Sequence, residues 1–389
     1  MKAFSPFEHG TVPMSRQFRS WSELSLLPYD ARTVDPYTRA RVLLMSGIES
    51  DATLTKHYLA RQIDDDAVKK HLAIVRRAES LQQQTIRSLI PPDETPIETA
   101  IGLEQLAVDL TADLAQNEAE DYFKQVLDFT LLEDLDHLYR FSLLYEIMER
   151  GNAERLTRGR TETKAGRTMA VQHRHPVDEM RAHFDLEDVT LRTLMNYFTI
   201  VSIEQEKMLF YKSAISSYPD RLARRLFGEI ADVEEQHLSQ YEAAGDPHMT
   251  ALERLMLMEL NEAYNYHSAF LGESDPAIRR LWKEFMGQEL EHFGLAVALF
   301  EQVDGRDAEE VLGNGIIPST IELHPNIDYV NAVLATQEGL QPYDGEFVPS
   351  GRLPADWPSF AFRNAQNKDG SPADEVEKRR PRERIRRPA

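Results

Sequence analysis

The chain carries the same pattern of acids and histidine twice, 155 residues apart. Adding 155 to the numbers of five residues in the first half gives an acid or a histidine in the second half each time. The pairs are Glu49 with Glu204, Glu79 with Glu234, Glu104 with Glu259, Asp134 with Glu289, and His137 with His292. A sixth position differs, because His237 corresponds to Gln82. Repetition at a fixed offset is typical of a fold that contains one structural unit twice.

The composition limits the kinds of partner and site. The 389 residues carry a formal net charge of −21, which disfavours nucleic acid because an acidic surface repels phosphate backbones. The chain contains no cysteine, which excludes disulfides, thiolate metal sites and iron–sulfur clusters within it. No apolar run is long enough to span a bilayer or to act as a secretory signal. We therefore expect a cytoplasmic protein without a membrane partner.

Proline, glycine and the spacing of apolar residues divide the chain into six segments. These are an irregular arm over 1–37, a first four-helix unit over 38–150, a polar linker over 151–185, a second four-helix unit over 186–304, a C-terminal extension over 305–362 and a disordered basic tail over 363–389. Two stretches, 151–175 and the last twelve residues, are locally basic, and both are expected to be solvated. The predicted fold class is therefore all-α, with two tandem four-helix units and a partly ordered extension.

The four helices of the second unit place acids at equal depth. We expect them over 186–216, 219–243, 249–271 and 276–303, with short loops between them. Glu204, Glu234, Glu259 and Glu289 lie near their middles, and mid-helix positions meet at one depth in an antiparallel bundle. Four carboxylates would therefore converge at the bundle centre. The short loops allow up-down-up-down connectivity within each unit, or helical hairpins exchanged between the two units.

Two of these helices add a histidine three residues after the acid, in the pairs Glu234–His237 and Glu289–His292. Positions i and i+3 share one helix face, so each pair could chelate one metal ion. Converging buried carboxylates also need positive charge to offset their lost hydration. Four carboxylates and two imidazoles suit two iron ions, with manganese or a mixed iron–manganese pair as alternatives. The other interpretation is a metal-free bundle in which these residues form surface ion pairs.

The pattern resembles the ferritin-like diiron carboxylate family, in which Glu, Glu-x-x-His, Glu and Glu-x-x-His lie on four helices. The resemblance implies terminal carboxylates at Glu204 and Glu259, bridging carboxylates at Glu234 and Glu289, and terminal imidazoles at His237 and His292. Glu262, one turn after Glu259, resembles an additional carboxylate ligand of the rubrerythrin branch, with a solvated acid as the alternative. The chain departs from the family in the short 244–248 connection, where ferritin and rubrerythrin have a long crossover. It also lacks the cysteine-ligated module of rubrerythrin.

The first half carries a weaker set, Glu49, Glu79, Glu104, Asp134 and His137, with Gln82 where the second half has a histidine. We expect a mononuclear or vestigial site there, with a working dinuclear site as the alternative. Tyr211 and Tyr266 each follow a candidate acid by seven residues. They are expected to pack in the core, although a buried tyrosine near such a centre could also donate a proton.

These features favour a diiron oxidase or oxygenase that activates O₂ or peroxide and acts on an unidentified small molecule. The resemblance implies two Fe ions as the cofactor and an electron donor that the sequence does not identify. It also leaves three alternatives: a rubrerythrin-like peroxide reductase, an iron-storage ferroxidase and a metal-free helical interaction protein. An oligomer is compatible with each of these functions.

Overall fold

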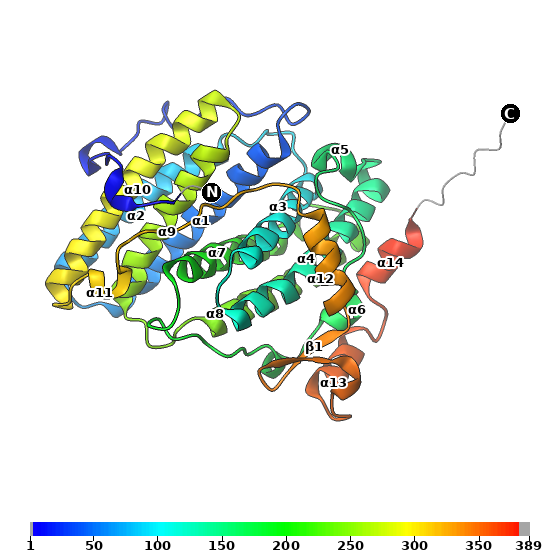
Figure 1. The fold of residues 1–389 in the computed structure, drawn as a ribbon. Helices are drawn as coiled ribbons and strands as arrows, with labels where there is room; N and C mark the ends of the chain where they lie inside the picture. Colours follow the sequence, from blue (N-terminus) through cyan, green and yellow to red (C-terminus); the bar gives the residue numbers. More distant parts are fainter. Residues whose placement is uncertain (1–2, 381–389) are drawn as a thin grey trace.

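The body of the molecule consists of eight long helices, four from each half of the chain. The computed structural model describes residues 3–380. The helices of the first half are α1 (Pro36–Gln62), α2 (Asp66–Arg87), α3 (Pro96–Gln116) and α4 (Asp121–Glu149). Those of the second half are α7 (Leu191–Ala214), α8 (Arg221–Ala244), α9 (Ala251–Gly272) and α10 (Pro276–Val303). The all-α prediction is confirmed (Figure 1).

The N-caps show that the two sets of helices keep the 155-residue offset. In every case the side chain of the N-cap residue accepts hydrogen bonds from backbone N–H groups of the first turn, which satisfies donors that have no partner inside the helix. The N-cap pairs are Asp35 and Thr190, Asp65 and Asp220, Thr95 and Thr250, and Glu120 and Asp275. Thr190 rather than Asp185 caps α7, so this helix begins five residues later than 186, its expected start.

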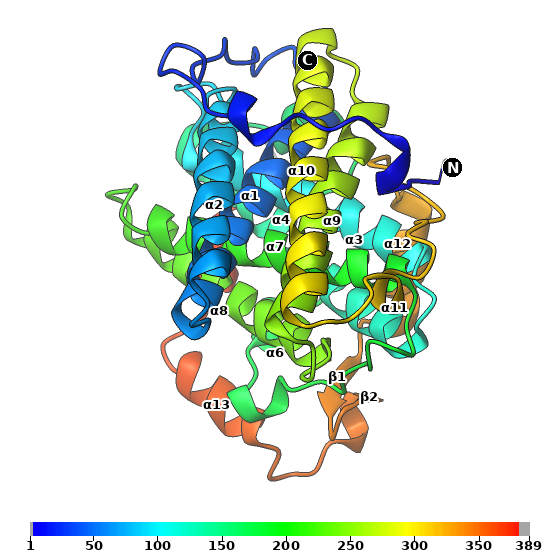
Figure 2. The same ribbon diagram turned by 90° about the vertical axis from the view of Figure 1, so that its left-hand side faces the viewer.

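Helical hairpins are exchanged between the two halves. The α1–α2 hairpin packs against α9 and α10, and the α3–α4 hairpin packs against α7 and α8. Figure 2 shows α1, α2, α9 and α10 together at the front of the molecule. The expected units over 38–150 and 186–304 are therefore not separate bundles. Of the two connectivities that the short loops allow, the structure has the exchanged one.

One large hydrophobic core joins the two bundles. Its buried residues come from all eight long helices, and α1 and α7 lie against each other across the boundary between the bundles. Phe141 of α4, for example, packs against Tyr211 of α7 and Phe227 of α8, with ring centroids 5.1 and 5.0 Å away. Because the core is continuous, neither half can bury its apolar surface without the other.

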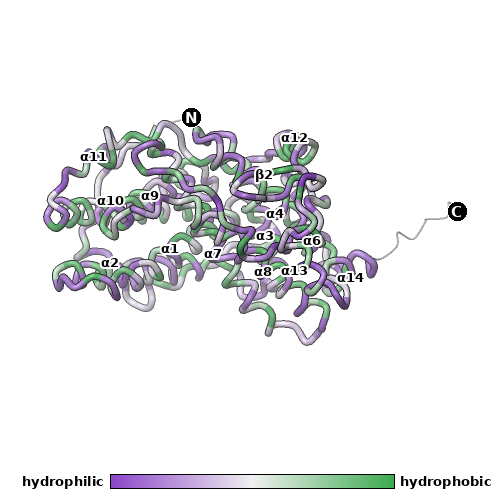
Figure 3. Tube along the Cα trace, turned by 90° about the horizontal axis from the view of Figure 1, so that it is seen from below, coloured by the Kyte–Doolittle hydropathy of each residue, from purple (hydrophilic) through white to green (hydrophobic). Residues whose placement is uncertain are grey.

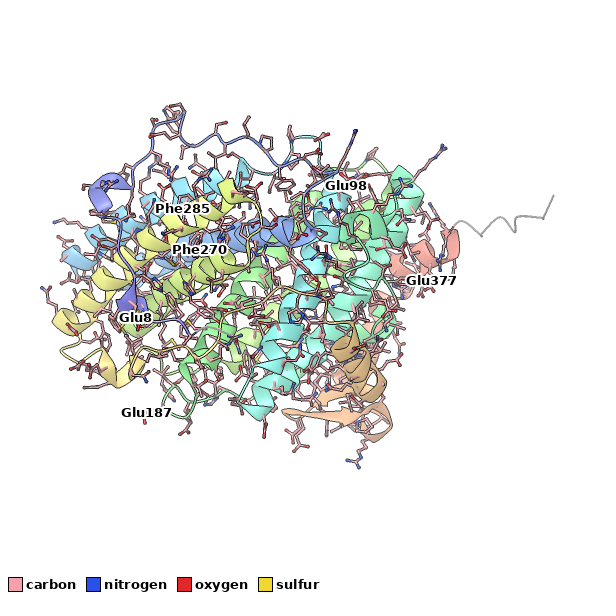
Figure 4. The ribbon with its side chains drawn as sticks, turned by 45° about the horizontal axis from the view of Figure 1, so that its top comes forward. Glu8, Glu98, Glu187, Phe270, Phe285 and Glu377 are labelled. Carbon is pink, nitrogen blue, oxygen red and sulfur yellow. The ribbon has the colours of Figure 1, made fainter. Side chains whose placement is uncertain are left out.

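The N-terminal arm is largely irregular, as expected, and it lies along α10. It contains the short helices η1 (Pro6–Glu8) and η2 (Met14–Arg16). The Val12 N–H donates to the Gly287 carbonyl at 2.7 Å, and a Cβ at Gly287 would lie only 3.0 Å from the Val12 side chain. Glycine thus permits the close approach of the arm. Arg19 stacks over Phe285, labelled in Figure 4, with its guanidinium carbon 5.0 Å from the ring centroid.

Residues 151–175 of the linker are not simply a solvated loop, in contrast to the expectation. The linker contains α5 (Ala153–Thr157), α6 (Met169–Gln172) and η3 (Pro176–Asp178). Arg167 and Arg174 are almost fully buried, and His173 is buried beside Glu229, with its Nε2 atom 3.4 Å from the carboxylate. The arginines can be buried because they pair with an acid of α4, a partner that their local sequence does not reveal.

Residues 305–380 run from the α9/α10 side of the molecule, where Arg306 pairs with Glu253, to the α3/α4/α7/α8 bundle, which α12 (Ile327–Gln337) and α14 (Pro372–Arg379) contact. The other helices of this segment are α11 (Glu309–Leu312) and α13 (Pro358–Gln366), with η4 at Ser350–Arg352. The strands β1 (Leu340–Tyr343) and β2 (Glu346–Pro349) form an antiparallel hairpin, with Gln341 opposite Val348. Its two-residue turn, Asp344–Gly345, has positive φ at both residues, as the twist of a tight hairpin favours.

The expected disorder beyond residue 362 is wrong for the described residues 363–380. Ala373 and Val376 of α14 are fully buried and pack with α4 and α8, and Ser371 caps the helix. Glu377 of α14, labelled in Figure 4, pairs with Arg140 of α4 at 2.6 Å. Apolar contacts that short-range composition does not reveal therefore order this segment. The rest of the basic tail, 381–389, lies outside the described residues.

Polar and apolar residues are mixed along the long helices, as the hydropathy colours of Figure 3 show. Within residues 3–380, no helix has the length and apolarity needed to cross a membrane. This pattern fits helices that bury only part of their circumference.

The hairpin exchange predicts that the first half does not fold alone. A 1–150 fragment should lack cooperative thermal unfolding as a monomer, because α1 and α2 lose their contacts with α9 and α10. Co-expression with a 151–389 fragment should restore a stable complex, measured by co-purification and circular dichroism. A monomeric 1–150 fragment that melts cooperatively would contradict this arrangement.

Candidate metal centres

Each bundle encloses a fully buried group of acids and histidines. We call the group between α3, α4, α7 and α8 cluster 2. It consists of Glu104, Asp134, His137, Glu204, Lys207, Glu234 and His237. Two sets of potential ligand atoms overlap in it, and within each set all atoms lie within 4.8 Å of one another. One set is Glu104, Asp134, His137 and Glu234, and the other is Asp134, Glu204, Glu234 and His237.

The overlap gives cluster 2 the ligand arrangement of two neighbouring cation positions. Asp134 and Glu234 belong to both sets and are therefore placed to bridge. Glu104 and His137 belong only to the first set, and Glu204 and His237 only to the second. Cluster 2 thus draws one Glu-x-x-His pair from α8 and one Asp-x-x-His pair from α4.

Both histidines of cluster 2 turn the Nδ1 atom inward and are held from outside through Nε2. His237 Nδ1 lies 3.2 Å from Glu234 and 3.4 Å from Glu204, and its Nε2 lies 2.9 Å from Glu133. His137 Nδ1 lies 2.9 Å from Glu234, and its Nε2 lies 2.9 Å from the Gln172 side-chain oxygen. A partner on the outer nitrogen that fixes the tautomer and leaves the inner nitrogen available is the arrangement found around metal-bound histidines.

Two arginines of the linker bind Glu133, the acid that contacts the outer nitrogen of His237. Glu133 accepts hydrogen bonds from Arg174 at 2.7 and 2.9 Å and from Arg167 at 3.1 Å, and it also contacts His237. Burial raises the pKa of Glu133, but Arg174, His237 and Arg167 outweigh this effect and hold its pKa well below the usual value. Nothing in the local sequence signals this network beyond the excess of basic residues.

Cluster 1 lies between α1, α2, α9 and α10. It consists of Glu49, Lys56, Glu79, Gln82, Glu259, Glu262, Glu289 and His292. It also contains two sets of ligand atoms, Glu79 with Glu259, Glu289 and His292, and Glu49 with Glu262 and Glu289. Glu262 is buried inside the cluster and is not a solvated acid.

Gln82 and the N-terminal arm complete cluster 1. The Gln82 amide donates to Glu289 at 2.5 Å, where cluster 2 has an imidazole at the corresponding position. His292 Nδ1 lies 2.8 Å from Glu289, and its Nε2 lies 2.6 Å from the side-chain oxygen of Gln17 in the arm. His292 therefore has the same orientation as the histidines of cluster 2, and the arm provides its outer partner.

A buried lysine lies inside each cluster, and sequence reasoning missed both. Lys207 Nζ lies 2.6 Å from Asp134, 2.9 Å from Glu234, 3.2 Å from Glu204 and 3.5 Å from Glu104. Lys56 Nζ contacts Glu79 and lies 3.1 Å from Glu259 and 3.2 Å from Glu262.

The available sequence signal was weak. Lys207 follows Glu204 by three residues and Lys56 follows Glu49 by seven, which places each lysine on the acid-bearing helix face.

One buried tyrosine lies beside each cluster. Tyr211 donates to Glu104 at 2.5 Å, and Tyr266 donates to Glu49. The expectation that they pack in the core is confirmed, since both are fully buried. Their hydroxyl groups in addition contact carboxylates of the clusters. Burial and the neighbouring carboxylates raise the pKa of each tyrosine well above its usual value, so both phenols keep their protons.

The electrostatics of the clusters differ from those of surface acids. Burial raises the pKa of Glu204 to about 8, against the opposing charge of Lys207, and that of Glu259 to about 7, against Lys56. Burial lowers the pKa of His292, but Glu289 outweighs this effect and raises it to about 9. The imidazole therefore carries a proton at neutral pH.

Several carboxylate oxygens in the clusters have no hydrogen-bond donor among residues 3–380. They include Asp134 Oδ2 and Glu204 Oε1 in cluster 2, and Glu49 Oε2, Glu79 Oε2 and Glu262 Oε2 in cluster 1. A buried oxygen without a partner costs free energy, and a cation would supply the missing interaction. The donor set, oxygen with imidazole nitrogen, fits a divalent transition metal.

The structure thus brings all the candidate ligands into clusters but not into the expected groups. The six second-half residues are divided: Glu204, Glu234 and His237 lie in cluster 2, and Glu259, Glu289 and His292 lie in cluster 1. The reason is the hairpin exchange, which pairs each half-set with a hairpin from the other half. Residues 155 apart therefore always occupy different clusters.

No family model, curated protein or solved structure matches the chain. The resemblance to the ferritin-like diiron carboxylate family therefore rests on the ligand pattern alone.

The Glu133 network gives a stability prediction. Glu133→Ala leaves Arg167 and Arg174 buried without their acid, and such a change destabilises a protein by about 3–5 kcal/mol. The matched change Glu377→Ala breaks the pair with Arg140 where the acid is half exposed, and should cost less than about 1 kcal/mol. Chemical denaturation measures both, and equal effects would contradict the structural role of Glu133.

Proposed function

We propose that the protein is a non-haem iron or manganese oxidoreductase that activates O₂ or peroxide and oxidises a small organic molecule. The observation that carries the proposal is cluster 2, where four helices deliver four carboxylates and two inward-facing imidazoles to two overlapping ligand sets. Glu204, Glu234–His237, Glu104 and Asp134–His137 reproduce the ligand pattern of ferritin-like diiron proteins, with one Asp in place of Glu.

The donor chemistry supports iron or manganese over other metals. The chain has no cysteine, so soft thiolate ligands are absent. Magnesium and calcium prefer oxygen donors alone, whereas cluster 2 offers two nitrogens. Structural zinc takes four ligands, usually rich in cysteine or histidine, and a carboxylate-rich set of six fits it poorly.

The residues of the chain have distinct tasks in this proposal. Iron or manganese, when bound, supplies the redox chemistry toward O₂ or peroxide. Gln172 and Glu133 hold the rings of His137 and His237 so that their Nδ1 atoms face the ligand carboxylates. Tyr211 keeps its proton and donates a hydrogen bond to Glu104 at 2.5 Å, which holds that carboxylate in position.

The surroundings of cluster 2 exclude water. Tyr211 is enclosed by Phe141 and Phe227, with ring centroids 5.1 and 6.0 Å away, and all the cluster residues are fully buried. A dry site strengthens the interactions between charged groups and protects reactive species from side reactions.

A specific observation favours a second candidate, a metal-free helical scaffold. Lys207 and the protonated histidines offset much of the charge of the four carboxylates without any metal. In that case the clusters are buried ion-pair networks that fix the register of the helices.

Elemental analysis after anaerobic Fe(II) loading and desalting separates the two candidates. We expect wild-type protein to retain iron and to consume O₂ on exposure to air. His137→Ala/His237→Ala should lose the iron of cluster 2 and most of the O₂ consumption, because each cation position loses its imidazole. His57→Ala, which changes an exposed histidine of α1, is the matched control and should behave like wild type.

Absence of bound iron and manganese from folded wild-type protein would exclude the oxidoreductase and leave the scaffold. Iron that is bound but does not react with O₂ directs the assay to peroxide.

A further inference from the structure

The lysine inside each cluster has a consequence for the number of metal ions, and this inference rests on the proposed metal-binding function. We propose that each cluster holds one divalent metal ion together with its own lysine ammonium group, and not a pair of metal ions. The lysine is then a resident cation that takes one of the two cation positions. The chain would carry two separate mononuclear centres, one in each bundle.

The position of Lys207 supports the proposal. Its Nζ atom is closest to Asp134, Glu234 and Glu204, at 2.6, 2.9 and 3.2 Å. These are the three carboxylates of the ligand set that also contains His237. An ammonium group there has the contacts that a metal ion in the same position would need. The remaining set, Glu104, Asp134, Glu234 and His137, is left for one metal ion.

Lys207 is enclosed by the carboxylates of cluster 2. Its side chain is fully buried, and its ammonium contacts carboxylates from all four helices of the bundle. A buried ammonium that leaves its carboxylates loses its charge partners, which costs more than any surface ion pair. A second divalent ion would also lie close to this positive charge in a medium that screens charge poorly.

Cluster 1 also contains a buried lysine among its carboxylates, and its sequence position does not correspond to that of Lys207. Lys56 contacts Glu79 and Glu259, two members of the set that contains His292, and it reaches Glu262 as well. The set that remains for a metal ion, Glu49, Glu262 and Glu289, offers oxygen atoms alone. The two lysines are not related by the 155-residue offset, since that offset places Ala52 opposite Lys207 and Tyr211 opposite Lys56. Each cluster therefore acquires its ammonium from a different helical turn, and both ammonium groups end among the ligand carboxylates.

The test is Mn(II) binding by the full-length protein, followed by elemental analysis and electron paramagnetic resonance. Two Mn(II) ions about 3.5–4 Å apart, as in two-metal sites, are exchange-coupled, whereas an isolated Mn(II) ion gives a six-line spectrum. We expect wild-type protein to bind one ion in each cluster and to show only the uncoupled signal.

Lys207→Met should admit a second ion to cluster 2, raising the count from two to three for each chain and adding the coupled signal. Lys56→Met should do the same in cluster 1. Lys212→Met changes an exposed lysine of the same helix as Lys207 and should leave both the count and the spectrum unchanged. Circular dichroism of each variant checks that it is folded.

Other outcomes separate the two proposals. A coupled signal in wild-type protein overturns the lysine proposal and keeps the metal-binding function. An unchanged count in folded lysine variants also overturns it. Absence of Mn(II) and Fe(II) from wild type and variants overturns the proposed function itself. If a lysine variant does not fold, the wild-type spectrum still decides between one ion and a coupled pair.

Discussion

The structure depends on offsetting the charge of carboxylates buried at the centres of two helical bundles. Nine acids lie in the two clusters, and their partners are the buried lysines, the inward-facing imidazoles and the amide of Gln82. Burying an acid without such a partner costs several kcal/mol, which is a large part of the stability of any domain. The helices can therefore pack closely only where they bring acid and cation together. This requirement fixes their depth and rotation in each bundle.

The exchange of hairpins between the two halves brings each buried lysine to acids from the other half of the chain. Lys207 belongs to α7, but two of its four carboxylates belong to α3 and α4, in the other half of the sequence. Lys56 belongs to α1, and its partners Glu259 and Glu262 belong to α9. Each buried lysine therefore depends on acids from the other half of the chain. The charge pairs thus act in the same direction as the continuous hydrophobic core, and both make the two halves interdependent.

The linker and the N-terminal arm, which lie outside the two bundles, also contact residues of the clusters or their neighbours. Arg167 and Arg174 of the linker compensate Glu133, which holds His237 in position. On the other bundle, Gln17 of the N-terminal arm contacts the outer nitrogen of His292. Segments that look like simple connections in the sequence therefore set the orientation of residues in the clusters. Such outer partners are what make a ligand side chain rigid enough to define a site.

The sequence was sufficient for the features that depend on local spacing. Apolar periodicity located the eight long helices, and the offset identified the acids and histidines that form the clusters. It was not sufficient for the pairing of hairpins, because acids at equal depth can converge in either connectivity. The burial of Lys207 and Arg174 was also missed, since each depends on acids of other helices. Composition alone assigns such residues to the surface.

The two clusters share their arrangement of four helices but not their donor atoms, and this difference has chemical consequences. Cluster 2 has two imidazoles, whereas cluster 1 has Gln82 at the position of His237 and the additional acid Glu262. More oxygen and less nitrogen favours harder cations such as manganese, and a second imidazole favours iron. Gln82 also donates to Glu289 and occupies one of its oxygens. The physical basis for different occupants in one molecule is therefore present in the side chains themselves.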